Sequence, residues 1–384
     1  MRKCIFILLV ILAVSYRLEA KKQEVVMPSG KEIYIPKDLQ GMDLQNPDSK
    51  WSYHRMAYTD NFVIFWEKGF GNDLSNPPQL EGHNMKVDLL NLTEKLESFY
   101  HFFRDTLKFS KPGSKCDKYR MMVMLNYSLE GTAYGGDYDG EIGALWIAPN
   151  RVQDKKLNCI AHELGHSFQG MLWQVNPEWI TDEKYHWDAF MKLTHKAYLH
   201  LENIYHSPYV LEYWGMKRGL PFIAELYRQG KQGEDPVITY KRMSGLDQKQ
   251  FCDEMFDAYR HFINWDFPRV WKETRPYANK YTTSLTTLSD GWYGIAPDNC
   301  PENYGFNAIP LALPEQGKKV KVEFCGEAGK EGYNAIHTDK ADWRYGFVAI
   351  TEDGKSIYGD VSDNSGKSII FTAPKVNNLT HLWL

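Results

Sequence analysis

The chain has 384 residues and a formal net charge of −4, with 43% hydrophobic and 24% charged residues. These values are typical of a globular protein with a sizeable core, and the length allows two or three domains. There is no basic excess, so the composition does not favour a nucleic-acid partner. The 12 Trp and 24 Tyr residues fit either an ordinary core or a groove for peptide or sugar.

Residues 1–20 have the pattern of a secretory signal peptide. Arg2 and Lys3 precede an apolar run from Ile5 to Val14, and the small residue Ala20 closes the segment. The run is too short for a comfortable membrane span, and no later stretch reaches about 18 apolar residues. We therefore expect a secreted, periplasmic or cell-surface protein without an integral membrane span after signal cleavage.

The segments after the signal predict an arm and then a mixed α/β unit. Residues 21–50 are polar and interrupted by prolines, and we interpret them as an N-terminal arm or linker. The β-branched and aromatic content of 61–69 indicates a strand. Apolar residues recur at helical spacing in 85–107, and 116–127 reads as a buried strand.

A Gly- and Asp-rich segment, 131–141, precedes a further strand at 142–147. Its acidic residues do not have EF-hand spacing, so we favour a glycine-rich turn over a calcium loop. We expect strand 142–147 to lie at the edge of the sheet. Such an edge strand can pair with an extended peptide.

The pentapeptide His162-Glu163-Leu164-Gly165-His166 is an H-E-x-x-H motif. On a helix its two histidines lie on one face, one turn apart, where two imidazoles can bind one zinc ion. The glutamate between them can act as a base on an activated water. The apolar pattern from Leu157 to Ala161 supports a helix here. The motif therefore predicts a Zn²⁺ site with His162 and His166 as ligands and Glu163 as the catalytic base.

A third ligand must come from elsewhere, because the extended motif H-E-x-x-H-x-x-G-x-x-H is not present. Gly170 stands one residue too late, and Leu172 occupies the position of the third histidine. The downstream candidates are acidic residues and one histidine: Glu178, Glu183, Glu202, Glu212 and His186. We favour Glu178, which opens an E-x-x-x-D pattern with Asp182, as does the ligand glutamate of thermolysin-like enzymes. Glu183 is the alternative, since it leaves more room after His166.

Hydrolysis also needs a donor that stabilises the oxyanion. The segment "NIYHSPY" offers Tyr205, His206 and Tyr209. We select His206 for this role. A packing or surface role stays open for all three.

The second half of the chain changes character near residue 275. Residues 182–271 read as mostly helical, whereas 276–384 contain short alternating segments typical of a β-sandwich. We therefore predict an α+β protein, with a zincin-like domain over 51–275 and a β-sandwich over 276–384. The apolar end of the chain suggests a further strand beyond Leu384. Cys300 and Cys325 are the pair that we expect to be disulfide-bonded.

Four segments together resemble a family of secreted Bacteroides-type proteins with a zinc-peptidase-like domain of unknown function. They are "NFVIFWEKGFG", "GTAYGG…GALWIAP", "AHELGHSFQ" and "YVLEYWGMKRGLPFIAELYR", and the resemblance spans residues 50–384. "HELGHSFQ" is also similar to the enhancin-type, mucin-directed metallopeptidases. The resemblance implies a gluzincin-like catalytic domain followed by a β-sandwich. It also implies a Trp-Glu-x-x-Ala-x-Trp helix that delivers the ligand glutamate, and the chain has no full match to that segment.

These observations lead to two hypotheses about function, one an enzyme and the other a binding module. The first is a secreted zinc metallopeptidase that hydrolyses peptide bonds of protein or glycoprotein substrates. The second is a catalytically inactive relative that binds peptide or glycan, with glycan contact through the C-terminal domain. The intact Glu163 favours the enzyme, because metal binding alone does not need this residue.

Overall fold

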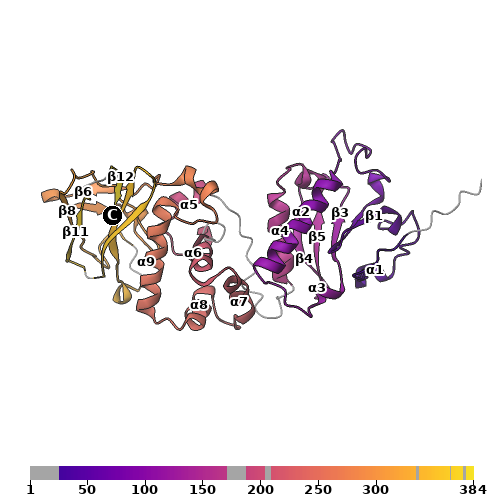
Figure 1. Cartoon of the computed structure of the whole chain (residues 1–384), viewed down its shortest axis with the longest axis horizontal. Helices are drawn as coiled ribbons and strands as arrows, with labels where there is room; N and C mark the ends of the chain where they lie inside the picture. Colours follow the sequence, from indigo (N-terminus) through magenta and orange to yellow (C-terminus); the bar gives the residue numbers. More distant parts are fainter. Residues whose placement is uncertain (1–25, 171–186, 204–208, 334–336, 364, 375–377) are drawn as a thin grey trace, which may run out of the picture.

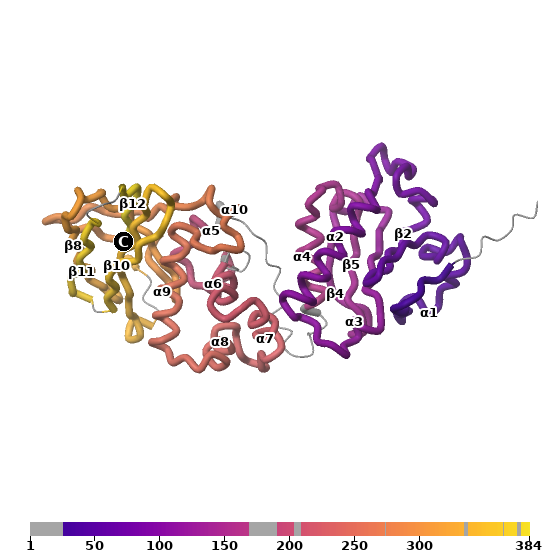
Figure 2. The backbone as a smooth tube through the Cα atoms, in the orientation of Figure 1, coloured from indigo at the N-terminus to yellow at the C-terminus, as the bar shows by residue number. Residues whose placement is uncertain are grey.

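The computed structural model describes residues 26–170, 187–203, 209–333, 337–363, 365–374 and 378–384. Within these ranges the chain is a mixed α+β protein, which confirms the predicted fold class at that level. Figure 1 shows two bodies arranged along the longest axis of the molecule, and Figure 2 follows the chain through them. The predicted signal peptide lies outside the described residues. Within the described ranges, no helix is long and apolar enough to cross a membrane.

A five-stranded sheet forms the centre of the first body, in the order β1-β2-β3-β5-β4. The three inner strands are parallel, and the two outer strands run antiparallel to their neighbours. The strand bounds are Met56–Tyr58 for β1, Phe62–Trp66 for β2, Met121–Leu125 for β3, Ala133–Tyr138 for β4 and Ile142–Ile147 for β5. Strands β2 and β3 are buried along their whole length, because both faces of the sheet are covered.

Two helices cover one face of this sheet. They are α2, Leu89–His101, and α4, Asn158–Gly170. Alternate strand residues such as Ile64 and Val123 pack against Leu96 of α2 and Leu164 of α4 in one apolar cluster. Helix α2 starts at an Asp88 cap and continues into a π-helical turn, Phe102–Thr106. This turn places Phe103 on Phe168 of α4, with the ring centroids 5.3 Å apart.

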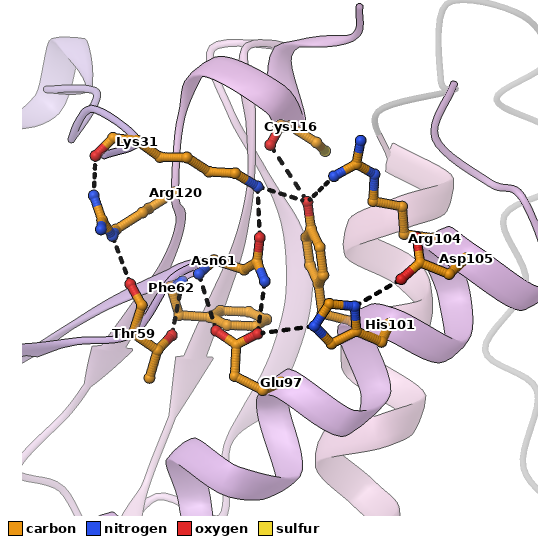
Figure 3. Close-up of polar contacts among 11 residues, drawn as sticks. Lys31, Thr59, Asn61, Phe62, Glu97, His101, Arg104, Asp105, Cys116 and Arg120 are labelled. Atoms are coloured by element: carbon orange, nitrogen blue, oxygen red, sulfur yellow. Dashed lines mark hydrogen bonds and ion pairs between the residues drawn. The ribbon is translucent and has the colours of Figure 1, made fainter. Parts of the chain in front are cut away.

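The N-terminal arm covers the other face. Leu39, in the short helix α1 (Lys37–Gln40), is buried in a cluster with Val63 and Met122. Figure 3 shows how polar contacts hold the arm: Lys31 donates from Nζ to Asn61 Oδ1 (2.5 Å) and to Tyr100 OH (3.0 Å). The described part of the arm is therefore a packed layer of the first body.

Helices and their aromatic side chains build the core of the second body. The helices are α5 (Trp187–Lys192), α6 (Tyr209–Arg218), α7 (Pro221–Gln229), α8 (Pro236–Ser244), α9 (Gln248–Asn264) and α10 (Trp271–Thr274). Trp214 stacks on Tyr240 with ring centroids 3.9 Å apart. Helix α7 also contacts the first body, because Arg228 donates to the backbone oxygens of Lys108 (2.6 Å) and Phe109 (3.1 Å).

Three small sheets complete the second body. Their orders are β10-β9-β12, β11-β8 and β6-β7. The strands are β6 (Leu285–Thr287), β7 (Tyr293–Ile295), β8 (Lys319–Glu323), β9 (Tyr345–Thr351), β10 (Ser356–Ser362), β11 (Ser368–Thr372) and β12 (Leu379–Trp383). Phe347 of β9 shares an apolar cluster with Phe371 of β11, whereas Val348 and Ile350 face the helical core. The β9 sheet therefore has buried residues on both faces.

Two sequence predictions about this fold are wrong. Residues 133–138, predicted as part of a turn, form strand β4, and this strand occupies the sheet edge that we assigned to 142–147. The reason is a tight hairpin: Asp139 and Gly140 have φ angles of 59° and 66°, so the chain reverses there and pairs β4 with β5. The second concerns Cys300 and Cys325, which are free thiols in the structure.

Candidate metal centre

Helix α4 has an apolar face in the core and a polar side next to it. Ile160, Leu164 and Phe168 are at most 1% exposed and anchor the helix in the apolar cluster beneath it. Their spacing of four residues puts them on one face. Since that face is occupied by the core, His162 and His166 lie beside it and are half-buried. The apolar side of the motif therefore determines where its polar side points.

The two histidines converge as the motif predicts. His162 Nε2 and His166 Nε2 are 3.1 Å apart, and the two rings are almost perpendicular at 88°. Two nitrogen ligands at about 2.0–2.1 Å from a tetrahedral zinc are separated by about 3.3 Å. The donor pair thus fits two positions of a zinc site without a change of backbone.

Glu163 points to the edge of the sheet. Its side chain is 8% exposed, and its Oε2 accepts a hydrogen bond of 2.9 Å from the backbone N–H of Gly135 in β4. In the register of β4 and β5, that N–H points away from β5, toward the outer edge of the sheet. The carboxylate therefore stands at the edge strand, next to the histidine pair in sequence.

Close packing of α4 on β4 and β5 sets this position. A Cβ atom on Gly135 would lie 1.7 Å from the backbone oxygen of Glu163. One on Gly143 would lie 2.2 Å from Met121 Cε and 3.2 Å from Ser167 Cβ. Ser167 is fully buried, and its hydroxyl donates to Ala144 O at 2.8 Å. Glycine in the strands and serine in the helix thus permit a helix–sheet contact closer than larger residues allow.

The proposed third ligands fall mostly outside the described residues. This holds for Glu178, Glu183 and His186, and their predicted roles stay predictions. The proposed oxyanion donor His206 and its alternative Tyr205 also lie outside the described residues. Glu202 is exposed and Glu212 pairs with Arg269 through an Nε–Oε1 contact of 2.8 Å. Over the described ranges, no three His, Cys, Asp or Glu side chains form a group that could hold a metal. Neither Glu202 nor Glu212 therefore completes the pair.

Tyr209 lies in the core of the second body. It is 2% exposed, and its ring packs against Phe190 and Trp265 at 4.8 and 5.0 Å. This is the packing role that the sequence left open, and it does not suit an oxyanion donor.

Two residues of the site were missed in the sequence, Gly135 and Ser167. The Asp139-Gly140 dipeptide was a local signal for the first, because Asp-Gly between alternating residues is a strong hairpin signal and would have placed β4 beside β5. Ser167 had no such signal, since its partner is a backbone oxygen of a neighbouring strand.

The acidic loop at the end of β4 holds the arm. Asp139 Oδ2 accepts from Tyr34 OH and from the backbone N–H of Lys37, each at 2.9 Å. These bonds hold the pKa of Asp139 below its usual value, with the backbone bond as the largest cause. The carboxylate thus has a structural role here.

Comparison with known families gives one assignment. The model of a family of unknown function (DUF6055) matches residues 25–172 and 170–384 of the chain. No curated protein matches the chain significantly. The predicted membership in a family of unknown function is confirmed, and the family description assigns no activity.

Proposed function

The chain belongs to this family of unknown function, DUF6055, and we propose that it is a secreted zinc-dependent metallopeptidase. We infer that residues 51–275 form a zincin-like catalytic domain and that residues 276–384 form a β-sandwich. The observation that carries the proposal is the pair of imidazole nitrogens 3.1 Å apart on α4. The same separation suits a hydrogen bond between the two imidazoles, and the position of Glu163 on the same helix, between the two histidines in sequence, is what favours a metal site.

His162 and His166 would hold the zinc, together with Glu178 or, as the alternative, Glu183. When bound, zinc would supply a water with a pKa of about 7 and polarise the substrate carbonyl. Glu163 would accept the proton of the attacking water and pass it to the leaving amine. The Gly135 N–H supports this role, because it holds Oε2 by a hydrogen bond of 2.9 Å and so orients the carboxylate.

The outer edge of β4 would hold the substrate. An extended peptide paired with this edge would run past Glu163 and bond to outward backbone groups of β4 other than the Gly135 N–H, which the carboxylate already occupies. His206 is proposed as the oxyanion donor. The substrate class proposed is protein or glycoprotein outside the cytoplasm, which follows from the signal-peptide pattern of residues 1–20.

Cleavage assays on casein and on mucin test the activity. The wild-type chain is compared with Glu163→Gln, and each assay is repeated with a zinc chelator. We expect cleavage that both the chelator and the substitution abolish, with zinc content unchanged in Glu163→Gln because Glu163 is not a ligand. Cleavage that survives both treatments would exclude the zinc mechanism. If nothing is cleaved although zinc is bound, the alternative of an inactive binding module is the better assignment.

Elemental analysis identifies the third ligand. The zinc content of Glu178→Ala and Glu183→Ala is measured beside that of wild type and His166→Ala. We expect Glu178→Ala to lose zinc as His166→Ala does, while Glu183→Ala retains it. Equal zinc in Glu178→Ala and wild type would remove Glu178 from the site.

A further inference from the structure

The β6–β7 hairpin carries an unusual concentration of exposed apolar side chains. Leu288 is 45%, Trp292 42% and Tyr293 62% exposed, all within one short segment. Over the described ranges, neither of the two aromatic rings stacks on another ring. In Figure 1, β6 lies at the end of the second body that is farthest from α4. The exposed rings are therefore remote from the candidate metal centre.

The backbone holds this hairpin in one shape. The N–H of Leu288 donates to Trp292 O at 2.8 Å, and Tyr333 OH donates to Ile295 O at 2.6 Å. Leu288 and Trp292 are thus opposite each other and share one face. Tyr293 follows Trp292 directly and points to the other face. Gly294 adds no side chain to the first face, and Leu288 lies over it, because a Cβ atom there would be 3.5 Å from Leu288 Cδ1.

The exposed area suits a small ligand better than a protein. From the exposed fractions, Trp292 and Leu288 together present about 150–200 Å² on their face. A stable protein interface needs about 800 Å² from each partner. The hairpin face is several times smaller, although it matches the size of one or two sugar rings.

Charge and hydrogen-bonding groups narrow the ligand further. Residues 284–296, "SLTTLSDGWYGIA", contain one charged side chain, Asp290, and no basic residue. A sulfated or sialylated sugar, a nucleic acid or an anionic membrane would find no cation in this segment. The exposed carboxylate of Asp290 and the hydroxyl of Thr286 can bond to sugar hydroxyls beside an indole face.

We propose that the Trp292 face of the β6–β7 hairpin is a binding site for neutral carbohydrate. The apolar C–H face of a pyranose ring stacks on the indole, and Asp290 and Thr286 bond its hydroxyl groups. The site would attach the protein to the glycans of its substrate, away from the place of cleavage. It relies on the proposed function only for the choice of a glycoprotein as the source of the sugar.

Native gels that contain mucin test this site without any cleavage. The full chain is used with Glu163→Gln, and the gel contains desialylated and desulfated mucin, untreated mucin or chemically deglycosylated mucin. We expect retardation by the neutral mucin, and a dissociation constant at least tenfold higher after Trp292→Ala. Tyr293→Ala on the opposite face and Leu90→Ala on α2 are the matched controls, and both should be retarded like the parent. Trp292→Tyr keeps a ring and should lose less binding than Trp292→Ala.

Several results would overturn the proposal. Equal retardation of Trp292→Ala and its parent would remove the indole from the site, and equal loss in Tyr293→Ala would show an effect on the hairpin as a whole. Retardation that needs sialic acid or sulfate would contradict a neutral ligand, and retardation by the bare polypeptide would indicate peptide docking. A dimer in sedimentation velocity that Trp292→Ala abolishes would identify the face as a contact between copies. Failure of the casein assay alone would leave this inference intact, because binding is measured without cleavage.

Discussion

Substitution of Gly135 by alanine tests the contact on which the candidate site rests. The new Cβ would lie 1.7 Å from the backbone oxygen of Glu163, whereas real Cβ contacts stay above 3.0 Å. The difference, 3.0 − 1.7 = 1.3 Å, is the least distance by which α4 and β4 must separate. Since the clashing atom is backbone, no side-chain rotation can relieve it.

Overpacking of this kind costs about 1–3 kcal/mol, and a lost hydrogen bond to a charged group adds about 1.5–3 kcal/mol. We therefore expect Gly135→Ala to lower the free energy of unfolding by about 3 kcal/mol or more. A displacement near 1 Å at a reacting group lowers activity by about 100-fold. The casein assay should therefore fall by that factor in material that is still folded.

Stability is measured by urea unfolding, monitored by circular dichroism, with Gly136→Ala as the control. Gly136 is the next residue of β4 and faces the other side of the sheet, where its Cβ would meet only side-chain atoms, at 3.2 Å or more. Alanine at that position should change stability by less than about 1 kcal/mol. If the two variants unfold at the same urea concentration, the close contact between α4 and β4 does not carry the stability that we assign to it.

Three further predictions concern other contacts of the described chain. Ser167→Ala should lower the free energy of unfolding in urea by about 1–3 kcal/mol, because Ala144 O loses a buried hydrogen-bond donor. Ser167→Cys is the comparison variant, since it adds no methyl group to the tight contact as Ser167→Thr does. Arg120→Ala should make residues 26–50 a target for trypsin while the rest of the chain resists, because Arg120 donates to the backbone oxygens of Ser29 and Lys31 in the arm and to that of Thr59 between β1 and β2. An unchanged digestion pattern would contradict this role. Hydrogen bonds from Arg242 lower the pKa of Glu234 from 4.5 to about 2. The contribution of Glu234 to stability is therefore present above pH 4.5 and is lost as the pH falls toward 2. The difference in unfolding free energy between wild type and Glu234→Gln should shrink from pH 7 to pH 3, and a constant difference would argue against the ion pair.

Much of the local structure was predictable because it depends on local periodicity. The buried run Phe62–Trp66 has the composition of a strand, and the apolar spacing of Leu89–His101 has the period of a helix. The same holds for the two histidines, since an i, i+4 spacing on any α-helix brings the side chains to one face. The mixed α+β class followed from the same patterns. The Asp139-Gly140 turn was also a local signal, although it was not used to place β4.

The position of the candidate base depended on contacts between distant segments. Glu163 bonds to Gly135, 28 residues earlier in the chain, because α4 packs on the edge strand of the sheet. Strand order is set by non-local pairing, and either β4 or β5 could have occupied the edge by local criteria. The contacts of the N-terminal arm were also not predictable from local sequence, since its polar and proline-rich composition gave no sign that Leu39 is buried against Val63. The sequence alone thus determined the helix and the two histidines of the motif. The tertiary structure decided what Glu163 faces, because that depends on which strand lies at the edge of the sheet.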